Sequence, residues 1–406
     1  QRSRPTMPKL LPLSLLLLAA VGGAQAAPTP ITIEQAMADP DWIGPPVESA
    51  WWSWNSQQVE YQLKRSGSPV RDTFRQTLSA AAGAQVADDQ RGTLDVANPV
   101  YDVSRQRSAF VRNGDVFVRD LRSGALTQLT RGSDRATGVG FATDGGVIWR
   151  TGHTWFHWTA AAGITQVATL KAEKNPADAP KADTLRDQQM RTLATLRRDR
   201  EQREALRTQE DAWRRADGSR APGPVYLGAD VAIVDSALSP DARHLVVVTK
   251  PKNFDEGRGG KMPKYVTESG YEESEDTRTR VGRNNPEPHA FWLVDARDGS
   301  VRPIKLDALP GIGNDPLAAL RKAAGKDALK GDRSVALLGG PGTPGIRWSD
   351  DGQQAAVLLR ANDNKDRWLV SVGATEPRLQ VRHRLTDQAW INWGFNDFGW
   401  MADGRT

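Results

Sequence analysis

Cysteine is absent from this chain of 406 residues. A chain without cysteine forms no disulfide, so its stability must come from a hydrophobic core and from strand pairing. The chain also has no large excess of positive or negative charge. The formal net charge is +5, and it falls to +2 when the predicted leader, which carries Arg2, Arg4, Lys9 and no acidic residue, is removed. No broad field remains to attract nucleic acid or a membrane surface.

Several catalytic motifs are missing as well. No Gly-x-Ser-x-Gly nucleophile elbow occurs. The segment 311–316 begins like a dinucleotide loop but has Pro316 at the third glycine, and Gly325-Lys326 is followed by Asp327, so neither is a nucleotide motif. Of the five histidines, His153 and His157 lie four positions apart, which in a strand separates them by roughly 13 Å. We predict no metal, no cofactor and no catalytic residue in this chain.

The amino-terminal residues predict export. Lys9 supplies a positive charge, residues 10–21 form an apolar run, and Ala-Gln-Ala at 24–26 resembles a cleavage site. The run is too short for a stable membrane span. We predict a signal peptide at 7–26, preceded by upstream residues, and a periplasmic or secreted protein.

The chain does contain a repeat. A small or aromatic residue, a polar Ser/Asp/Gly turn and an apolar run follow one another six times. The copies are residues 54–59, 103–110, 141–148, 238–245, 348–355 and 400–405. A period of roughly 40–50 residues made of strands and tight turns is typical of β-propeller blades.

The second half of each unit repeats too. An alternating run, a turn and a second short run occur at 115–130, 155–167, 291–304 and 367–386. Alternation with a period of two indicates strands with one packed face, and Asp-Gly or Ser-Gly between them indicates a hairpin. A β-sandwich could use similar turns, but it does not require the same pattern at each interval. We predict an all-β, incomplete β-propeller of five to six blades, with its sixth copy cut off at the chain end.

The predicted division of the chain is upstream residues with the signal peptide at 1–26, a lead-in at 27–46 and a partial propeller at 47–406. Two long gaps between copies of the repeat predict insertions into this propeller. The first insertion, 170–224, is predicted to hold one long solvated helix with a capping box at Thr184 and Asp187. Its apolar stripe consists of Leu185, Leu193, Leu196, Leu206 and Trp213. The second insertion, 251–285, is polar and Gly-rich and is predicted to be a loop. A Gly/Pro segment at 339–345 is also predicted to be a loop, and these two loops are expected on one face.

Fourteen tryptophans are many for this length. Eight of them fall at blade positions: Trp54, Trp149, Trp155, Trp158, Trp292, Trp348, Trp368 and Trp400. Large rings at such positions would fill the space between sheets. A platform for a ligand is the alternative.

Three stretches, 52–75, 280–295 and 385–400, carry a family resemblance. They contain Trp52-Ser53-Trp54, Arg280 to Pro286 leading into Phe291 to Asp295, and Leu385-Thr386-Asp387 to Trp400. Together they resemble the N-terminal propeller of exported serine peptidases of the prolyl oligopeptidase family, dipeptidyl peptidase IV branch. In that family an α/β-hydrolase domain with a Ser, Asp and His triad follows the propeller, and this chain lacks it.

The resemblance implies that the propeller gates access and helps to bind the free amino terminus of a peptide, typically through a pair of glutamates. Carboxylates in a low-dielectric cavity pair strongly with an ammonium group. Glu272 and Glu273 are the obvious adjacent pair, although they follow the 239–241 turn, which the family's pair precedes. Glu210 and Asp211 are the acidic pair nearest to the expected place. For both pairs the alternative is a solvated surface acid.

Two functions remain open at this point. The first is the substrate-gating propeller of a serine exopeptidase, whose partners are a peptide with a free amino terminus and the missing hydrolase domain, with a homodimer of the full-length parent possible. The second is a non-enzymatic envelope scaffold that binds a protein partner, because fold alone does not decide function. The chain by itself is predicted to be inactive.

Overall fold

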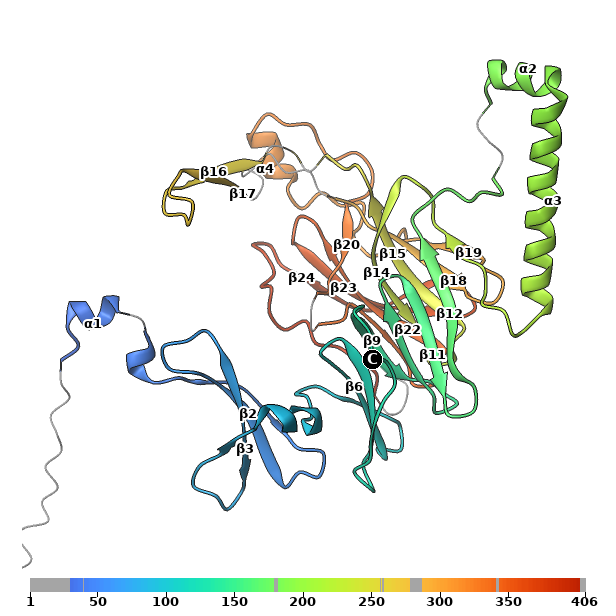
Figure 1. Cartoon of the computed structure of the whole chain (residues 1–406). Coiled ribbons are helices and arrows are strands. Elements are labelled where there is room, and N and C mark those ends of the chain that lie inside the picture. Colours follow the sequence, from blue (N-terminus) through green and yellow to red (C-terminus); the bar gives the residue numbers. More distant parts are fainter. Residues whose placement is uncertain are drawn as a thin grey trace, which may run out of the picture. The chain divides into compact units, whose positions relative to one another are not determined.

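The computed structural model describes residues 30–38, 40–178, 182–255, 257, 259–277, 287–340 and 343–401 (Figure 1). The chain divides into two compact units, Gln1–Leu94 and Asp95–Thr406. The predicted signal peptide, the 280–286 stretch and the turn of the sixth copy lie outside the described residues. In the part of the chain that is described, no helix is long and apolar enough to cross a membrane.

The first unit holds one antiparallel sheet in the order β1-β2-β3-β4. Its strands are β1 (Val47–Trp52), β2 (Gln58–Lys64), β3 (Arg71–Thr77) and β4 (Ala84–Gln85), after a short helix α1 (Ile33–Met37) and 3-10 turn η1 (Pro40–Ile43), and before η2 (Asp88–Thr93). Glu60 is fully buried, and its carboxylate accepts hydrogen bonds from Trp51 Nε1 at 2.8 Å and from Arg75 Nη2 at 2.7 Å. These bonds satisfy a charge that would be costly to bury alone.

The second unit holds four larger sheets, each built from strands consecutive in the chain except for one inserted hairpin. They comprise β5 (Val100–Tyr101), β6 (Arg107–Arg112), β7 (Asp115–Asp120) and β8 (Leu126–Gln128); β9 (Ala136–Phe141), β10 (Val147–Thr151), β11 (Thr154–Thr159) and β12 (Gly163–Lys171) with β13 (Val225–Tyr226); β14 (Val231–Leu238), β15 (His244–Pro251), β18 (Ala290–Asp295) and β19 (Val301–Ile304); and β20 (Val335–Leu337), β21 (Ile346–Trp348), β22 (Gln354–Ala361), β23 (Asp366–Gly373) and β24 (Leu379–Thr386).

Three hydrophobic cores lie between successive sheets of this unit. Trp149 and Val116 belong to the core between the first and second of these sheets, Leu245 and Trp155 to the next, and Trp368 with its neighbours to the third. The strands that directly precede the repeated turn also touch in two pairs of successive sheets, β5 against β9 and β14 against β21. Sheets that meet at these strands and stack face to face are blades, and the predicted β-propeller is confirmed.

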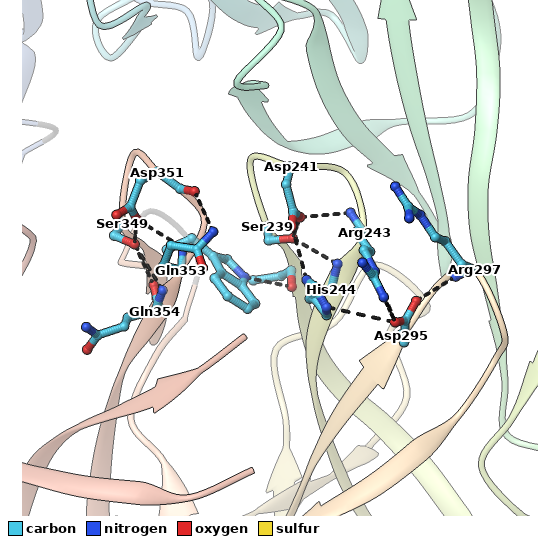
Figure 2. Close-up of polar contacts among 12 residues, drawn as sticks. Ser239, Asp241, Arg243, His244, Asp295, Arg297, Ser349, Asp351, Gln353 and Gln354 are labelled. Carbon is cyan, nitrogen blue, oxygen red and sulfur yellow. Dashed lines mark hydrogen bonds and ion pairs between the residues drawn. The ribbon is translucent and has the colours of Figure 1, made fainter. Parts of the chain in front are cut away.

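The repeated sequence pattern forms the turn between the first and second strands of every blade. A left-handed residue recurs in each of the five copies whose turns the structure describes: Ser56, Arg105, Gly145, Ala242 and Gly352, with φ between 51° and 80°. In Figure 2, Ser239 Oγ accepts from His244 N at 2.9 Å while Asp241 Oδ1 accepts from Arg243 N at 3.0 Å. Ser349 and Asp351 repeat both contacts one blade later. The repeat therefore encodes a side-chain-capped turn.

Replacing Asp241 with alanine should lower the free energy of unfolding by about 2 kcal/mol, because its carboxylate accepts from Ser239 Oγ and from Arg243 N and contacts His244 Nδ1 at 3.1 Å. Urea unfolding followed by circular dichroism measures the change. Asp350→Ala, at an exposed position of the equivalent turn, is the matched control. Equal midpoints for the two variants would show that the cap contributes nothing.

Tryptophans at blade positions divide into two groups. Trp149, Trp155 and Trp368 are at most 3% exposed, and the other five are half-buried. Trp348 Nε1 donates to Ala237 O of the preceding blade at 3.0 Å, and Trp400 Nε1 donates to Arg347 O at 2.8 Å. Ala237 and Arg347 are equivalent positions, because each lies two residues before the serine that opens its turn. The contact of Trp400 in the sixth copy therefore repeats the contact of Trp348 in the fifth.

The first insertion differs from its prediction. It forms two helices, α2 (Thr184–Thr192) and α3 (Ala194–Ala216), separated at Leu193, whose φ of −100° and ψ of 97° are extended. The Thr192 hydroxyl donates to Gln188 O at 2.7 Å, a local bond that competes with helix continuation. The N-cap is Asp183, which accepts from Arg186 N at 3.0 Å, so the capping box at Thr184 is wrong by one residue.

The second insertion is not a simple loop. It contains a two-stranded hairpin of β16 (Gly260–Lys264) and β17 (Glu273–Thr277), which pair antiparallel. Its alternating polar residues have no buried face, so the sequence shows no core signal for these strands. A short helix α4 (Ala318–Ala323) lies in the connection between β19 and β20.

Candidate functional site

Both insertions leave the blades at the same end. In each blade the capped turn closes the end where the first strand finishes, so the second-to-third and fourth-to-first connections lie at the opposite end. Thr143 N donates to Pro240 O at 2.8 Å, and Gly352 lies against Asp241, so the capped turns of three successive blades are neighbours. The described residues of the connections at 172–224, 252–289 and 305–334 therefore emerge on the opposite face, which is the candidate functional surface.

Glu272 and Glu273 lie on the β16–β17 hairpin that rises from this surface. Both are exposed, and Glu273 accepts from Ser269 Oγ at 2.7 Å. Because side chains alternate along a strand, Glu273 shares a face with Glu275 and not with its neighbour Ser274. Sequence reasoning missed Glu275, since only adjacent acids were considered. The hairpin offers five exposed carboxylates, Glu268, Glu272, Glu273, Glu275 and Asp276, with Glu273 and Glu275 about 7 Å apart on one side.

Glu210 and Asp211 lie on α3. Glu210 forms ion pairs with Arg214 at 3.1 Å and Arg220 at 3.0 Å, while Asp211 is exposed. Consecutive residues on a helix point about 100° apart, so the two carboxylates do not converge. Glu210 also lines a cavity of about 420 Å³ between α3 and β12. The ion pairs of Glu210 with Arg214 and Arg220 give this carboxylate a structural part in the helical insertion.

A cavity of about 600 Å³ with polar and apolar lining residues opens on the same face between β19 and β20. His289 and Arg333 line it, with Asp307 and Asp332 exposed at its rim. His289 Nδ1 accepts from Leu337 N at 3.0 Å, which leaves its proton on Nε2. Burial lowers the pKa of His289, so the ring is neutral at neutral pH. No local sequence motif could have found this group, because its members come from separate segments.

The glycine-rich segment at 311–316 has a structural role. Gly311 has a φ of +77°, and its carbonyl accepts from Arg333 Nη2 at 2.8 Å. A Cβ at this position would lie 2.4 Å from Arg384 Nη2. The glycine therefore allows Arg333 and Arg384 to approach the backbone. The segment 311–316, which only begins like a dinucleotide loop, thus takes part in the contacts of this blade. Across the described ranges, His, Asp and Glu nowhere gather in threes with metal-site geometry.

No protein-family model matches the chain, and no curated protein sequence matches it. Among solved structures it is similar to dipeptidyl peptidase 4 of Porphyromonas gingivalis, with 10% identity and a TM-score of 0.41, covering 90% of this chain and 43% of that one. It is also similar to TolB of Acinetobacter baumannii, with 11% identity and a TM-score of 0.31, covering 84% of this chain and 57% of that one. The chain thus spans less than half the length of the peptidase.

Proposed function

We propose that this chain is the substrate-gating propeller of an exported serine exopeptidase, and that it binds the free amino terminus of peptides. The observation that carries the proposal is the acidic β16–β17 hairpin, which stands on the face of the propeller where both insertions emerge. Of the three stretches that resemble the dipeptidyl peptidase IV branch, the first lies in the first sheet, the described part of the second leads into β18, and the third lies around and after the end of β24. Acyl transfer would belong to a hydrolase domain.

Charge gives the hairpin its proposed role. Glu272, Glu273 and Glu275 are exposed, and Glu273 and Glu275 face one side, so an ammonium group could contact two carboxylates at once. Exposed ion pairs contribute little in water and are screened by salt. The binding expected of this chain alone is therefore weak, with a Kd on the order of 1 mM, or about −4 kcal/mol.

The test is calorimetric titration of the chain with the peptide Ala-Pro-Ala at low ionic strength. The free peptide should bind in the millimolar range, and its N-acetylated twin should bind at least about 5-fold more weakly, because acetylation removes the ammonium charge. The triple substitution Glu272→Gln, Glu273→Gln and Glu275→Gln should abolish this difference.

A charge-matched control uses the same hairpin. Glu268→Gln with Asp276→Asn removes two carboxylates, one from the connecting turn and one whose partner is Lys261 at 3.6 Å on the other side of β17. This variant should keep the preference for the free amino terminus. Equal binding of the free and acetylated peptides by the unchanged chain would refute the proposal.

The scaffold alternative has one observation in its favour. Leu185, Leu206 and Trp213 on the α2–α3 insertion are 54–72% exposed. An apolar set on a projecting helix pair is a common feature of protein-binding surfaces. Loss of peptide selectivity in the titration, together with specific capture of one envelope protein by these helices, would favour this second function.

A further inference from the structure

Four arginines lie on one face of the last described blade. Arg360 on β22 is directly opposite Arg367 on β23 in the strand register, and Arg347 on β21 pairs with Ala356, which lies two alternations from Arg360. Arg382 donates to Ser371 Oγ at 2.8 Å on the same face. The other face of this sheet carries Val357, Leu359 and Trp368 and packs on the preceding blade.

Arg360 and Arg367 form a like-charge pair, and no carboxylate of the described residues forms an ion pair with either of them. Direct cross-strand pairs of like charge are destabilising. Arg367 is 5% exposed; its Nη atoms donate to Asn396 Oδ1 at 2.7 Å and to the carbonyls of Gly394 and Asn392, and its buried Nε has no partner among the described residues. The side chain of Arg360 has no hydrogen bond or ion pair with any described residue, and its Cζ lies 5.2 Å from the ring centroid of Trp393.

The charged neighbours of this pair differ from those of Arg333, another buried arginine of the same sheet region. Arg333 is also 5% exposed, but it has Asp366 at 2.6 Å and Asp363 at 3.2 Å. Burial lowers the pKa of Arg360, the charge of Arg367 lowers it further, and burial lowers the pKa of Arg367. Arg367 is buried and Arg360 half-buried. A buried cation is ordinarily compensated by an anion, and no carboxylate of the described residues pairs with either arginine.

A cavity of about 360 Å³ borders the same group. It is lined by Leu338, Gly339, Gly340 and Thr343 on one side and by residues 393–397 on the other. Trp393, over which Arg360 lies, and Gly394 and Asn396, which Arg367 holds, all contribute to its wall. Asp397 also lines it, but it is exposed and forms no ion pair with either arginine.

We propose that Arg360 and Arg367, beside the cavity walled by Trp393, form a binding site for a carboxylate group. The planar guanidinium offers parallel N–H donors that match the two oxygens of a carboxylate, and one such group can neutralise both charges. A carboxylate can come from an acidic residue of a peptide or from a free organic acid. The site is distinct from the acidic hairpin, which would attract groups of the opposite charge.

The experiment is calorimetric titration of the chain at low ionic strength with N-acetylated, C-amidated Ala-Glu-Ala, with its Ala-Gln-Ala twin, and with succinate. The Glu peptide should bind at least 10-fold more tightly than the Gln twin. Arg360→Met should reduce that affinity at least 10-fold. Arg360→Lys keeps the charge but not the planar donors, so its affinity should lie between those of the unchanged chain and of Arg360→Met. Arg382→Gln, on the same face but with its own partners Ser371 and Gln354, should bind as the unchanged chain does.

Asp397→Asn provides an independent variant that leaves both arginines intact. It removes a negative charge from the cavity wall and should tighten binding of the Glu peptide about 2- to 5-fold. Tighter binding of succinate than of the Glu peptide would support the site with a free acid as its ligand. Equal binding of the Glu and Gln peptides without binding of succinate, or binding that survives Arg360→Met unchanged, would overturn the proposal.

Discussion

Replacing Asp366 with alanine is expected to lower the free energy of unfolding by about 3–5 kcal/mol. The carboxylate is 2% exposed and forms ion pairs with Arg333 at 2.6 Å and with Arg384 at 2.7 Å. Its removal leaves Arg333, whose side chain is 3% exposed, with only Asp363 at 3.2 Å as a charge partner. Urea unfolding of the purified chain measures the loss, and Asp327→Ala, at an exposed position, is the control.

This contribution should depend on pH in a defined direction. Burial alone would raise the pKa of Asp366, but hydrogen bonds from Arg384 and Arg333 outweigh burial and hold the pKa below its usual range. A carboxyl group with a lowered pKa stabilises the fold above its unfolded pKa of about 3.9, and this stability is lost as the pH falls through the folded pKa. The stability difference between the unchanged chain and Asp366→Asn should therefore be full at pH 7 and shrink below about pH 4. A difference that stays constant down to pH 2 would contradict the ion-pair explanation.

The repeat in the sequence predicted the blade turns because each turn is a local structure. Ser239 and Asp241 bond to residues no more than five positions away, and the same short spacing returns in Ser349 and Asp351. Trp348 and Trp400 begin equivalent copies of the pattern, and both donate from Nε1 to a backbone carbonyl of the preceding blade. Short-range hydrogen bonds leave a pattern that a reader of the sequence can recognise.

Contacts between distant segments left no such pattern. Asp366 lies 33 positions from Arg333 and 18 from Arg384, and nothing local in the sequence indicates that they meet. The hairpin of β16 and β17 escaped prediction because strands exposed on both faces lack apolar alternation. The break at Leu193 escaped because neither glycine nor proline marks it. The roles of Glu272, Glu273, Glu210 and Asp211 in substrate binding stay predictions.

Trp149→Ala is expected to cost about 3–5 kcal/mol of unfolding free energy, since truncating a buried tryptophan loses its apolar contacts and leaves a cavity. Trp149 is 2% exposed, lies in the core between the first two sheets of the second unit, and stacks on Phe156 with ring centroids 5.8 Å apart. Trp149→Phe keeps much of the ring and should cost about 1–2 kcal/mol.

The location of Trp149 makes this substitution a test of how blades support one another. Its core is shared by β6 and β7 of one blade and β9 and β10 of the next, so losing the ring should destabilise both blades together. Hydrogen exchange should then speed up at amides of Val116 and Val147 alike, while Trp213→Ala, at a position 54% exposed on α3, should leave both rates unchanged. Faster exchange confined to β9 and β10 would mean that each blade holds its structure alone, and that stacking contributes little to the stability of this propeller.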